Sequence, residues 1–363
     1  MEINKIYNEN SLTGLKNLPD NSIDCCVTSP PYFGLGDYGN SEQIGLENTP
    51  ELFVEQLVKV FTEVKRVLKK EGTLWLNLGD SYWGGKGQSG QKDADIQDER
   101  NKAGKSISSK AQQMGGKGIT MPKDGKHHTI KPKDLIGIPW MVAFALRSSG
   151  WYLRQDIIWS KPNPMPESVT DRCTKAHEYI FLMSKSNKYY YDSEAIKTPL
   201  NESSYSRMDR GVSETHKNIN GAPGQTPHSM NKPRLNVKAG VIGGKKHKNL
   251  EDNGLTNHSF HKTRNEGKEW ESLDGMANKR SVWTVTTKPY SGAHFATFPE
   301  ELICDMIKAG CQEGGVVLDP FMGVGTTALV ARKLNRNYVG FELNPKYIKI
   351  AENRLRSELG LFL

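Results

Sequence analysis

Apolar residues along the chain gather in three blocks, roughly 3–84, 135–192 and 282–355. Within each block, short apolar runs alternate with stretches whose apolar residues recur every three or four positions. The first pattern is typical of buried strands and the second of amphipathic helices. The spacing predicts strands over 23–28, 72–78, 152–159, 179–183, 316–318 and 338–341, and helices over 52–69, 140–147, 300–308, 327–334 and 345–355.

The alternation of strands and helices predicts an α/β domain built on a mostly parallel sheet. Two polar, glycine-containing segments, 85–134 and 193–280, interrupt the apolar blocks and show no clear periodicity. We interpret the first as an inserted loop and the second as an irregular region outside the sheet. With 363 residues, of which 36% are hydrophobic, the chain is long enough for one sizeable core and a smaller module.

Composition argues against several classes of protein. No run of about 18 apolar residues occurs, so we expect no transmembrane helix, and residues 1–20 lack the apolar stretch and cleavage site of a signal peptide. The five cysteines form no CxxC pair and no cluster with histidine. We therefore expect a cytoplasmic protein without a metal site and without a membrane partner.

The formal net charge of +8 is unevenly placed. Segment 85–134 holds 11 Lys/Arg against 6 Asp/Glu, and segment 201–280 holds 14 against 9, so the rest of the chain is slightly acidic. Concentrated positive charge suits a polyanion, because phosphate contacts dominate the affinity of proteins for nucleic acid. Solvated basic linkers explain the same charge equally well.

A nucleoside-binding pattern lies near the C-terminus. The apolar run Val316–Leu318 leads through Asp319 into a turn with Gly323 and Gly325, and a helix follows. Ligands of open α/β sheets bind at the carboxyl ends of strands, where glycines let the backbone approach them closely. Glu342 ends the next strand, where an acid accepts hydrogen bonds from ribose hydroxyls. A third glycine is missing, which favours a nucleoside over a dinucleotide, and an ordinary tight turn is the alternative.

The sequence Thr28-Ser29-Pro30-Pro31-Tyr32 follows another predicted strand. The two prolines end that strand and make a rigid loop. Tyr32 is suited to stack on a base flipped out of a duplex, and Ser29 with a backbone carbonyl near Pro30 is suited to accept hydrogen bonds from an exocyclic amine. A plain Pro-Pro turn is the alternative for this motif taken alone.

Four other features have two interpretations each. Cys25 and Cys26 lie inside the apolar strand before the loop, so we interpret them as core residues, which argues against a cysteine nucleophile. Asp80 either borders the active site or caps a helix or turn. Residues 159–164 either line the base pocket or form a simple turn. His127 and His128 are expected to be solvated rather than metal ligands.

Taken together, these motifs resemble the amino-methyltransferase family of DNA modification enzymes, which methylate cytosine N4 or adenine N6. In that family the catalytic motif is Asp/Asn/Ser-Pro-Pro-Tyr/Phe, matched here by Ser29–Tyr32, and the cofactor motif is similar to Asp319–Thr326. The order, with the catalytic motif first and the cofactor motif last, is that of the family's beta-type members. The similarity covers about two thirds of the chain, namely 1–84, 135–192 and 282–355.

The resemblance implies a Rossmann-like S-adenosylmethionine-dependent methyltransferase fold with helices on both faces of the sheet and a circularly permuted motif order. It implies a catalytic half at 1–192 with the basic insertion 85–134, a target-recognition region at 193–280, and a cofactor-binding half at 281–363. The implied catalytic residues are Ser29, Pro30, Pro31 and Tyr32. The implied cofactor-binding residues are Asp319, Phe321, Gly323, Gly325, Thr326, Glu342 and Asn344, with Thr297, Phe298 and Pro299 from the segment 294–300, and Asn10, which stands where the family often has an acid.

The same resemblance implies that S-adenosyl-L-methionine is the cofactor and double-stranded DNA the partner, with base flipping of the target. A restriction endonuclease acting on the same site would complete a restriction-modification pair, and a homodimer is a further expectation. Ser29 in place of Asp favours cytosine N4, although both targets are aromatic amines and adenine N6 stays open. An RNA or protein amide methyltransferase and a non-catalytic DNA-binding relative are the remaining alternatives.

Overall fold

The computed structural model describes residues 1–34, 42–84, 127–200, 276–288 and 298–360. The chain divides into two compact units: residues 1–196 with 280–363, and residues 197–279. Of the second unit the structure describes a short antiparallel pair, β6 (Thr198–Pro199) with β7 (Met276–Ala277). Most of the predicted insertion 85–134 and of the predicted target-recognition region 193–280 therefore lies outside the described residues.

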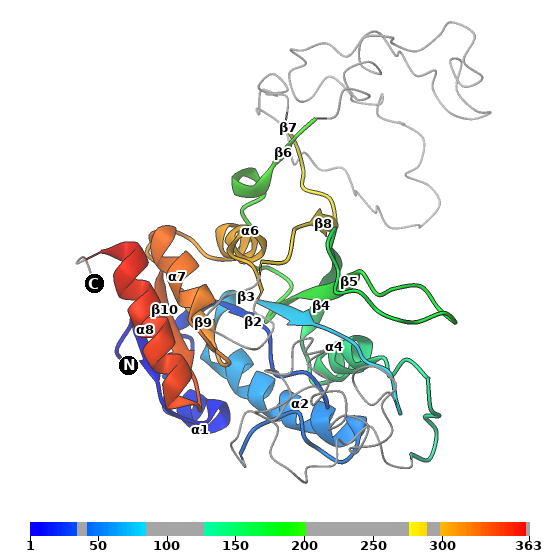
Figure 1. The fold of residues 1–363 in the computed structure, drawn as a ribbon. Helices are drawn as coiled ribbons and strands as arrows, with labels where there is room; N and C mark the ends of the chain where they lie inside the picture. Colours follow the sequence, from blue (N-terminus) through cyan, green and yellow to red (C-terminus); the bar gives the residue numbers. More distant parts are fainter. Residues whose placement is uncertain (35–41, 85–126, 201–275, 289–297, 361–363) are drawn as a thin grey trace, which may run out of the picture. The chain divides into compact units, whose positions relative to one another are not determined.

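The first unit is built on an eight-stranded sheet with the strand order β1-β10-β9-β2-β3-β5-β4-β8 (Figure 1). All neighbours pair in parallel except β5, which is antiparallel to both β3 and β4. The predicted mostly parallel sheet is thus confirmed. The strands are β1 (Lys5–Tyr7), β2 (Ile23–Thr28), β3 (Leu68–Leu78), β4 (Tyr152–Ser160), β5 (His177–Ser184), β8 (Val282–Thr284), β9 (Val316–Asp319) and β10 (Asn337–Phe341).

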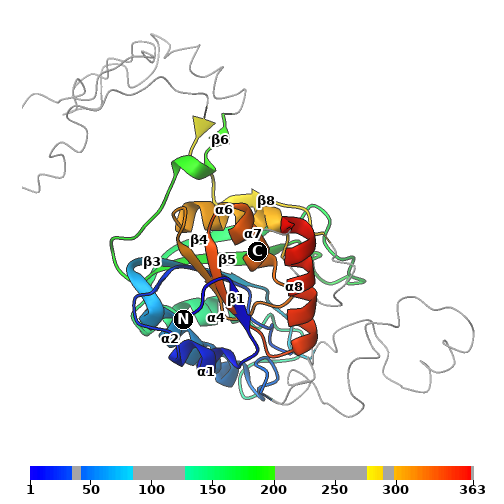
Figure 2. The same ribbon diagram turned by 90° about the vertical axis from the view of Figure 1, so that its left-hand side faces the viewer.

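Helices cover both faces of this sheet, as Figures 1 and 2 show from two sides. One face carries α1, α2 and α4, and the other carries α6, α7 and α8. The helices are α1 (Ser11–Lys16), α2 (Pro50–Val67), α4 (Ile138–Ser148), α6 (Glu300–Gly310), α7 (Thr326–Lys333) and α8 (Pro345–Leu359), with a 3₁₀ turn η3 (Glu194–Ile196). Within the described residues no helix combines the length and the apolar character needed to cross a membrane.

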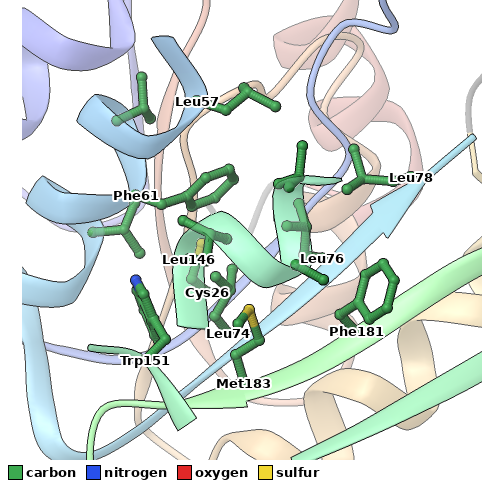
Figure 3. Close-up of a cluster of buried hydrophobic side chains, with 14 of the residues drawn as sticks. Cys26, Leu57, Phe61, Leu74, Leu76, Leu78, Leu146, Trp151, Phe181 and Met183 are labelled. Carbon is green, nitrogen blue, oxygen red and sulfur yellow. The ribbon is translucent and has the colours of Figure 1, made fainter. Parts of the chain in front are cut away.

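Strand alternation divides the core into two clusters. Successive side chains of a strand point to opposite faces, so Leu74 and Leu76 of β3 pack under α2 and α4 while Trp75 between them packs on the α6 side. Figure 3 shows the first cluster, in which Leu57 and Phe61 of α2 come down onto β3. Each such fully buried side chain contributes about 1.5–3 kcal/mol relative to an exposed one.

The order of the strands creates a switch point between β9 and β2. From β9 the chain passes through α7 to β10 on one side, and from β2 it passes through α2 to β3 on the other. Crossovers that run in opposite directions leave a crevice outside the carboxyl ends of the two central strands, where ligands of such sheets bind. The two predicted motifs, about 290 residues apart in sequence, follow these two strands.

The predicted helices and strands are all present, with two kinds of difference. Strand β3 begins at Leu68 rather than at residue 72, because Leu68 is buried and pairs with Ile23 of β2. The pattern did not predict β1, α1 or β8, because none of them has the continuous apolar run or the repeated helical spacing that marked the predicted elements. β1 and β8 form the two edges of the sheet.

Candidate active site

The predicted catalytic loop begins where β2 ends against β9. Thr28, the last residue of β2, is buried and its hydroxyl donates to Asp319 Oδ1 over 2.6 Å. Pro30 is buried, whereas Ser29, Pro31 and Tyr32 are half-buried. The loop therefore starts at the switch point, directly after a residue that is bonded to the end of β9.

The hydroxyl group of Tyr32 is fixed by hydrogen bonding. Its hydroxyl donates to Glu178 Oε2 over 2.6 Å, and Asn77 Oδ1 lies 3.4 Å away. The ring lies against Gly79, since a Cβ at Gly79 would be 2.5 Å from Tyr32 Cε2. A residue other than glycine at this position would displace the ring or the strand end.

Glu178 was not predicted, and it is the centre of a polar cluster on the next strands. It lies at the start of β5, accepts from Asn77 Nδ2 over 3.1 Å, and forms an ion pair with Lys161 just after β4. The Lys161 Nζ atom also lies 4.3 Å from the centre of the Trp159 ring. The predicted role of residues 159–164 in lining a base pocket stays a prediction, but the structure does bring Lys161 to the Tyr32 side chain through Glu178.

Asp80 acts as a helix cap, one of its two interpretations. Its carboxylate accepts from the backbone N–H of Gly137 and of Ile138, where α4 begins, over 3.0 to 3.1 Å. Its backbone carbonyl accepts from Lys175 Nζ over 2.8 Å, and burial lowers the pKa of that lysine. Asp80 therefore satisfies the unpaired amides of a helix N-terminus that has no cap of its own.

Asp319 is 1% exposed, and both of its carboxylate oxygens are bonded within the protein. Besides Thr28, the Thr327 hydroxyl donates to it over 2.6 Å and the Phe321 N–H over 3.0 Å. Burial raises the pKa of Asp319 to about 6, and these three donors oppose that rise. Through these three hydrogen bonds Asp319 links β2, the glycine turn and α7.

The glycine turn and Glu342 form one bonded unit. Gly323 and Gly325 have φ angles of +54° and +79°, a conformation that side chains other than glycine rarely adopt. The Gly323 N–H donates to Glu342 Oε2 over 2.9 Å, and the Asn344 N–H donates to Oε1 over 2.8 Å. Burial raises the pKa of Glu342. A Cβ at Gly323 would meet nothing within 4 Å, so this turn borders open space beside the carboxylate.

The N-terminus of α1 reaches the same turn. Asn10 caps the helix, its side chain accepting from the Leu12 N–H over 2.9 Å. The next residue, Ser11, is buried and donates to the Pro320 carbonyl over 2.6 Å, and Asn8 donates to the carbonyls of Glu342 and Leu343. Ser11 and Asn8 were not predicted from the sequence, and their side chains join α1 and the residue after β1 to both ends of the predicted cofactor site.

The remaining predicted cofactor residues lie around this unit. Asn344 caps α8 by accepting from the Lys346 N–H over 3.0 Å, and Thr326 begins α7 with its hydroxyl accepting from Arg354 over 2.9 Å. Phe321 is half-buried in the turn itself. Phe298 and Pro299 directly precede α6, with Pro299 as its N-cap residue. Thr297 lies outside the described residues.

The cysteines and histidines have structural surroundings. Cys25 and Cys26 are fully buried, on opposite faces of β2, and burial raises the pKa of both thiols well above the ordinary value. Their predicted place in the core is confirmed. The expected solvation of His127 is wrong: its side chain is 2% exposed, packs on Trp83, and accepts from the Ile130 N–H over 3.0 Å. His128 is exposed. No group of three metal-ligating side chains occurs among the described residues.

Comparison with known proteins gives relatives along the whole chain. A family model described as a DNA methylase of the N6/N4 type matches residues 23–353. The chain is 39% identical over 353 residues to the Type II methyltransferase M.Cfr9I of Citrobacter freundii, covering 97% of this chain and 88% of that protein. It is 38% identical over 351 residues to the Type II methyltransferase M.SmaI of Serratia marcescens, covering 97% and 90%.

Solved structures share the fold. The PvuII DNA methyltransferase, described as cytosine-N4-specific, superposes with a TM-score of 0.55 at 16% identity, covering 96% of this chain and 85% of that chain. A putative DNA modification methylase from Thermus thermophilus, in complex with S-adenosyl-L-methionine, gives a TM-score of 0.52 at 18% identity, covering 99% and 95%. The match of the family model, the identity of nearly 40% along the whole chain and the two motifs meeting at one switch point show that this chain belongs to the N6/N4 family of DNA methylases.

Proposed function

We propose that the protein transfers a methyl group from S-adenosyl-L-methionine to the exocyclic N4 of a cytosine flipped out of duplex DNA. The observation that carries this proposal is the hydrogen bond between Thr28 and Asp319. It joins the catalytic loop to the strand that carries the cofactor turn, so an amine held by the loop lies beside a nucleoside held by the turn. Proximity of this kind supplies much of the rate of a group transfer.

The residues around Gly323 fit the proposed cofactor. The turn borders open space, and the adjacent Glu342 carboxylate has one backbone donor on each oxygen. A carboxylate oxygen accepts more than one hydrogen bond, so Glu342 is suited to bind ribose hydroxyls as well. When bound, the cofactor supplies a sulfonium methyl group as the electrophile. We also assign the side chains of Asn10 and Phe298 to the edges of this cofactor site.

At the other side of the switch point, Ser29 and the backbone near Pro30 hold the amine of the base. A hydroxyl and a carbonyl that accept its hydrogens orient the nitrogen lone pair toward the methyl group. They also help the nitrogen leave its planar, conjugated state. Tyr32 stacks on the base, as aromatic side chains do in enzymes that flip their target.

The choice of cytosine N4 over adenine N6 rests on Ser29 in the first position of the motif. The PvuII DNA methyltransferase, which is described as cytosine-N4-specific and shares the fold, supports this choice. DNA binding through Lys and Arg of segments 85–134 and 193–280 completes the proposal, together with a restriction endonuclease acting on the same site, as the Type II names of the relatives suggest.

One experiment tests the target base. The protein is incubated with labelled S-adenosyl-L-methionine and duplex DNA of mixed sequence, and the digested nucleosides are separated. We expect labelled N4-methylcytosine from the wild-type protein and roughly a 10-fold slower reaction from Ser29→Ala, which loses one acceptor. Labelled N6-methyladenine instead would overturn the base assignment, and an unchanged rate for Ser29→Ala would overturn the role of the loop.

A second measurement tests the grip on DNA. Affinity for a duplex should fall steeply as salt rises from about 50 to about 200 mM, because each phosphate contact releases counterions, and a slope of several units in log–log form is expected. An affinity for duplex DNA that does not change with salt would contradict the assignment of the basic segments.

A further inference from the structure

The polar cluster behind Tyr32 has no part in the function proposed so far. The cluster joins the ends of three neighbouring strands on the side of the sheet where Tyr32 lies. Its members are Asn77 near the end of β3, Lys161 just after β4, and Glu178 near the start of β5. The side chains of Lys161 and Glu178 are only 18% and 12% exposed. Among the partners of Glu178, Tyr32 is 146 residues away in sequence and Asn77 is 101.

The contacts of Glu178 are arranged around one carboxylate. Its Oε2 accepts from the Tyr32 hydroxyl over 2.6 Å and from Asn77 Nδ2 over 3.1 Å, while Oε1 pairs with Lys161. Hydrogen bonds to an ionised acceptor are shorter and stronger than those between neutral groups. The carboxylate therefore defines where the end of the Tyr32 side chain lies.

Lys161 is itself fixed. Its Nζ atom lies over the Trp159 ring, and the Trp159 indole N–H donates to the Val285 carbonyl over 2.8 Å. The Lys161 backbone N–H donates to the Ala176 carbonyl over 2.8 Å, which ties β4 to the residues before β5. Lys161, which pairs with Glu178, is therefore itself held in place by backbone hydrogen bonding at the end of β4.

A cluster of this kind has a geometric effect rather than a large stabilising one. Desolvation of both partners offsets much of the attraction within a buried ion pair, but the donors and acceptors still restrict Tyr32 to one orientation. The backbone at Gly79 packs against the edge of the Tyr32 ring, since a Cβ there would be 2.5 Å from Tyr32 Cε2. With the hydroxyl and the ring edge both fixed, the aromatic surface is ordered before any base arrives, so binding does not have to order it.

We infer that Glu178 is a positioning residue for the methyl transfer: it sets the Tyr32 ring as a fixed platform for the target base, and Lys161 holds Glu178 in place. The inference rests on the proposed function, in which a flipped base stacks on Tyr32. The carboxylate also makes the phenol ring more electron-rich, which favours stacking on a base whose amine nitrogen becomes positively charged as it uses its lone pair.

A double-mutant cycle tests this inference. Tyr32→Phe keeps the ring and removes the hydroxyl, whereas Glu178→Ala keeps the hydroxyl and removes its acceptor. We expect each to lower kcat about 10-fold, and the double variant to be little slower than either, because both remove the same hydrogen bond. Dissociation constants for S-adenosyl-L-methionine should stay within about 2-fold of wild type, since the cofactor turn keeps its contacts. Glu178→Gln keeps an acceptor and should recover part of kcat.

The matched control is Glu63→Ala, which removes another ion-paired glutamate, bonded to Arg66 on α2 with a side chain 20% exposed. Its kcat should equal that of wild type. Independent, multiplying losses for Tyr32→Phe and Glu178→Ala would overturn the inference, as would a wild-type kcat for Glu178→Ala. If Glu178→Ala lowers the unfolding temperature strongly, Tyr32→Phe combined with Glu178→Gln gives a second cycle in folded protein. Because glutamine keeps an acceptor but not the charge, its coupling to Tyr32→Phe should be smaller but of the same sign, and losses that simply multiply would again overturn the inference.

The cycle separates the inference from the proposed function. The identity of the base labelled by wild-type protein decides the proposed function. The coupling between Tyr32 and Glu178 decides the positioning role, whichever base is methylated. Labelled N4-methylcytosine with no coupling would overturn the inference alone.

Discussion

The two sides of the switch point, the proposed cofactor side and the proposed catalytic side, are each built around buried or half-buried acids, yet they are held together differently. On the cofactor side, Asp319 and Glu342 take many of their donors from residues between 2 and 19 positions away, mostly backbone amides and a threonine hydroxyl. On the catalytic side, Glu178 takes its partners from 17, 101 and 146 positions away, and all are side chains. Apart from the bond from Thr28 to Asp319, the carboxylates of the cofactor side are held by local donors, whereas the carboxylate of the catalytic side is held by residues that the sheet brings together.

The charges differ as well. Uncharged donors surround Asp319, so burial is opposed only in part and the pKa of the carboxyl is raised to about 6. Glu178 has a lysine beside it. From this contrast we infer that the fold keeps an ionised Asp319 at a desolvation cost, because no cation among the described residues lies beside it. On the catalytic side, the ion pair with Lys161 offsets the desolvation of Glu178 itself. Three predictions probe the contrast.

The largest effects should separate binding from turnover. Glu342→Ala should weaken the binding of S-adenosyl-L-methionine about 100-fold, because a hydrogen-bonded carboxylate is lost. Tyr32→Ala should leave that affinity unchanged and lower kcat about 10- to 100-fold, the range expected for loss of base stacking. Calorimetry and single-turnover kinetics measure the two quantities. A matching loss of cofactor affinity in Tyr32→Ala would show that the two sides are not separate.

A second prediction concerns the residue that joins both sides. Because the pKa of Asp319 is about 6 in the folded protein, against 3.8 for an aspartate free of burial, the folded state binds the proton more tightly. This contribution to stability is fully present below about pH 4 and is lost as pH rises through about 6. Relative to Asp319→Asn, which does not titrate, wild type should gain about 2.5 kcal/mol of unfolding free energy between about pH 7 and about pH 4.

Chemical denaturation of both proteins at several pH values measures this difference, and other carboxylates cancel in the comparison. The slope of the difference should not exceed about 1.4 kcal/mol per pH unit. A difference that does not vary with pH would mean that Asp319 has the same pKa in the folded and unfolded states.

The smallest effect is expected at Asp80. Asp80→Ala removes the cap of α4 and should cost about 1 kcal/mol of unfolding free energy, whereas Asp80→Asn keeps an acceptor and should cost less. Thermal unfolding checks the order of the three proteins. A large fall in kcat without a change in stability would instead assign Asp80 to the chemistry of the catalytic side.

Most of the fold was predictable because its elements show either a continuous apolar run or a helical period. The strand of residues 23–28 and the helix at 52–69 are examples, and the latter is found as α2 (Pro50–Val67). The edge strands β1 and β8 are three residues each, and they exist because a partner strand offers unpaired backbone groups, which no local pattern records.

The candidate site follows the same division. Gly323 and Gly325 are recognisable from sequence because a turn with positive φ requires glycine at both. Glu178, Asn77 and Ser11 gave no such signal, since each is an ordinary residue for its element. The prediction for His127 was wrong for a related reason: its polar neighbours in sequence suggested solvent, while Trp83 and Glu51, far away in sequence, contact it.

The sequence by itself determined the class of the sheet, the two motifs and the local cofactor turn, because periodicity and turn chemistry act over a few residues. Only the tertiary structure decided which side chains surround Tyr32 and what Asp80 and Asp319 bond to. Those contacts depend on which strands lie side by side, and burial of apolar surface by the whole domain fixes that order.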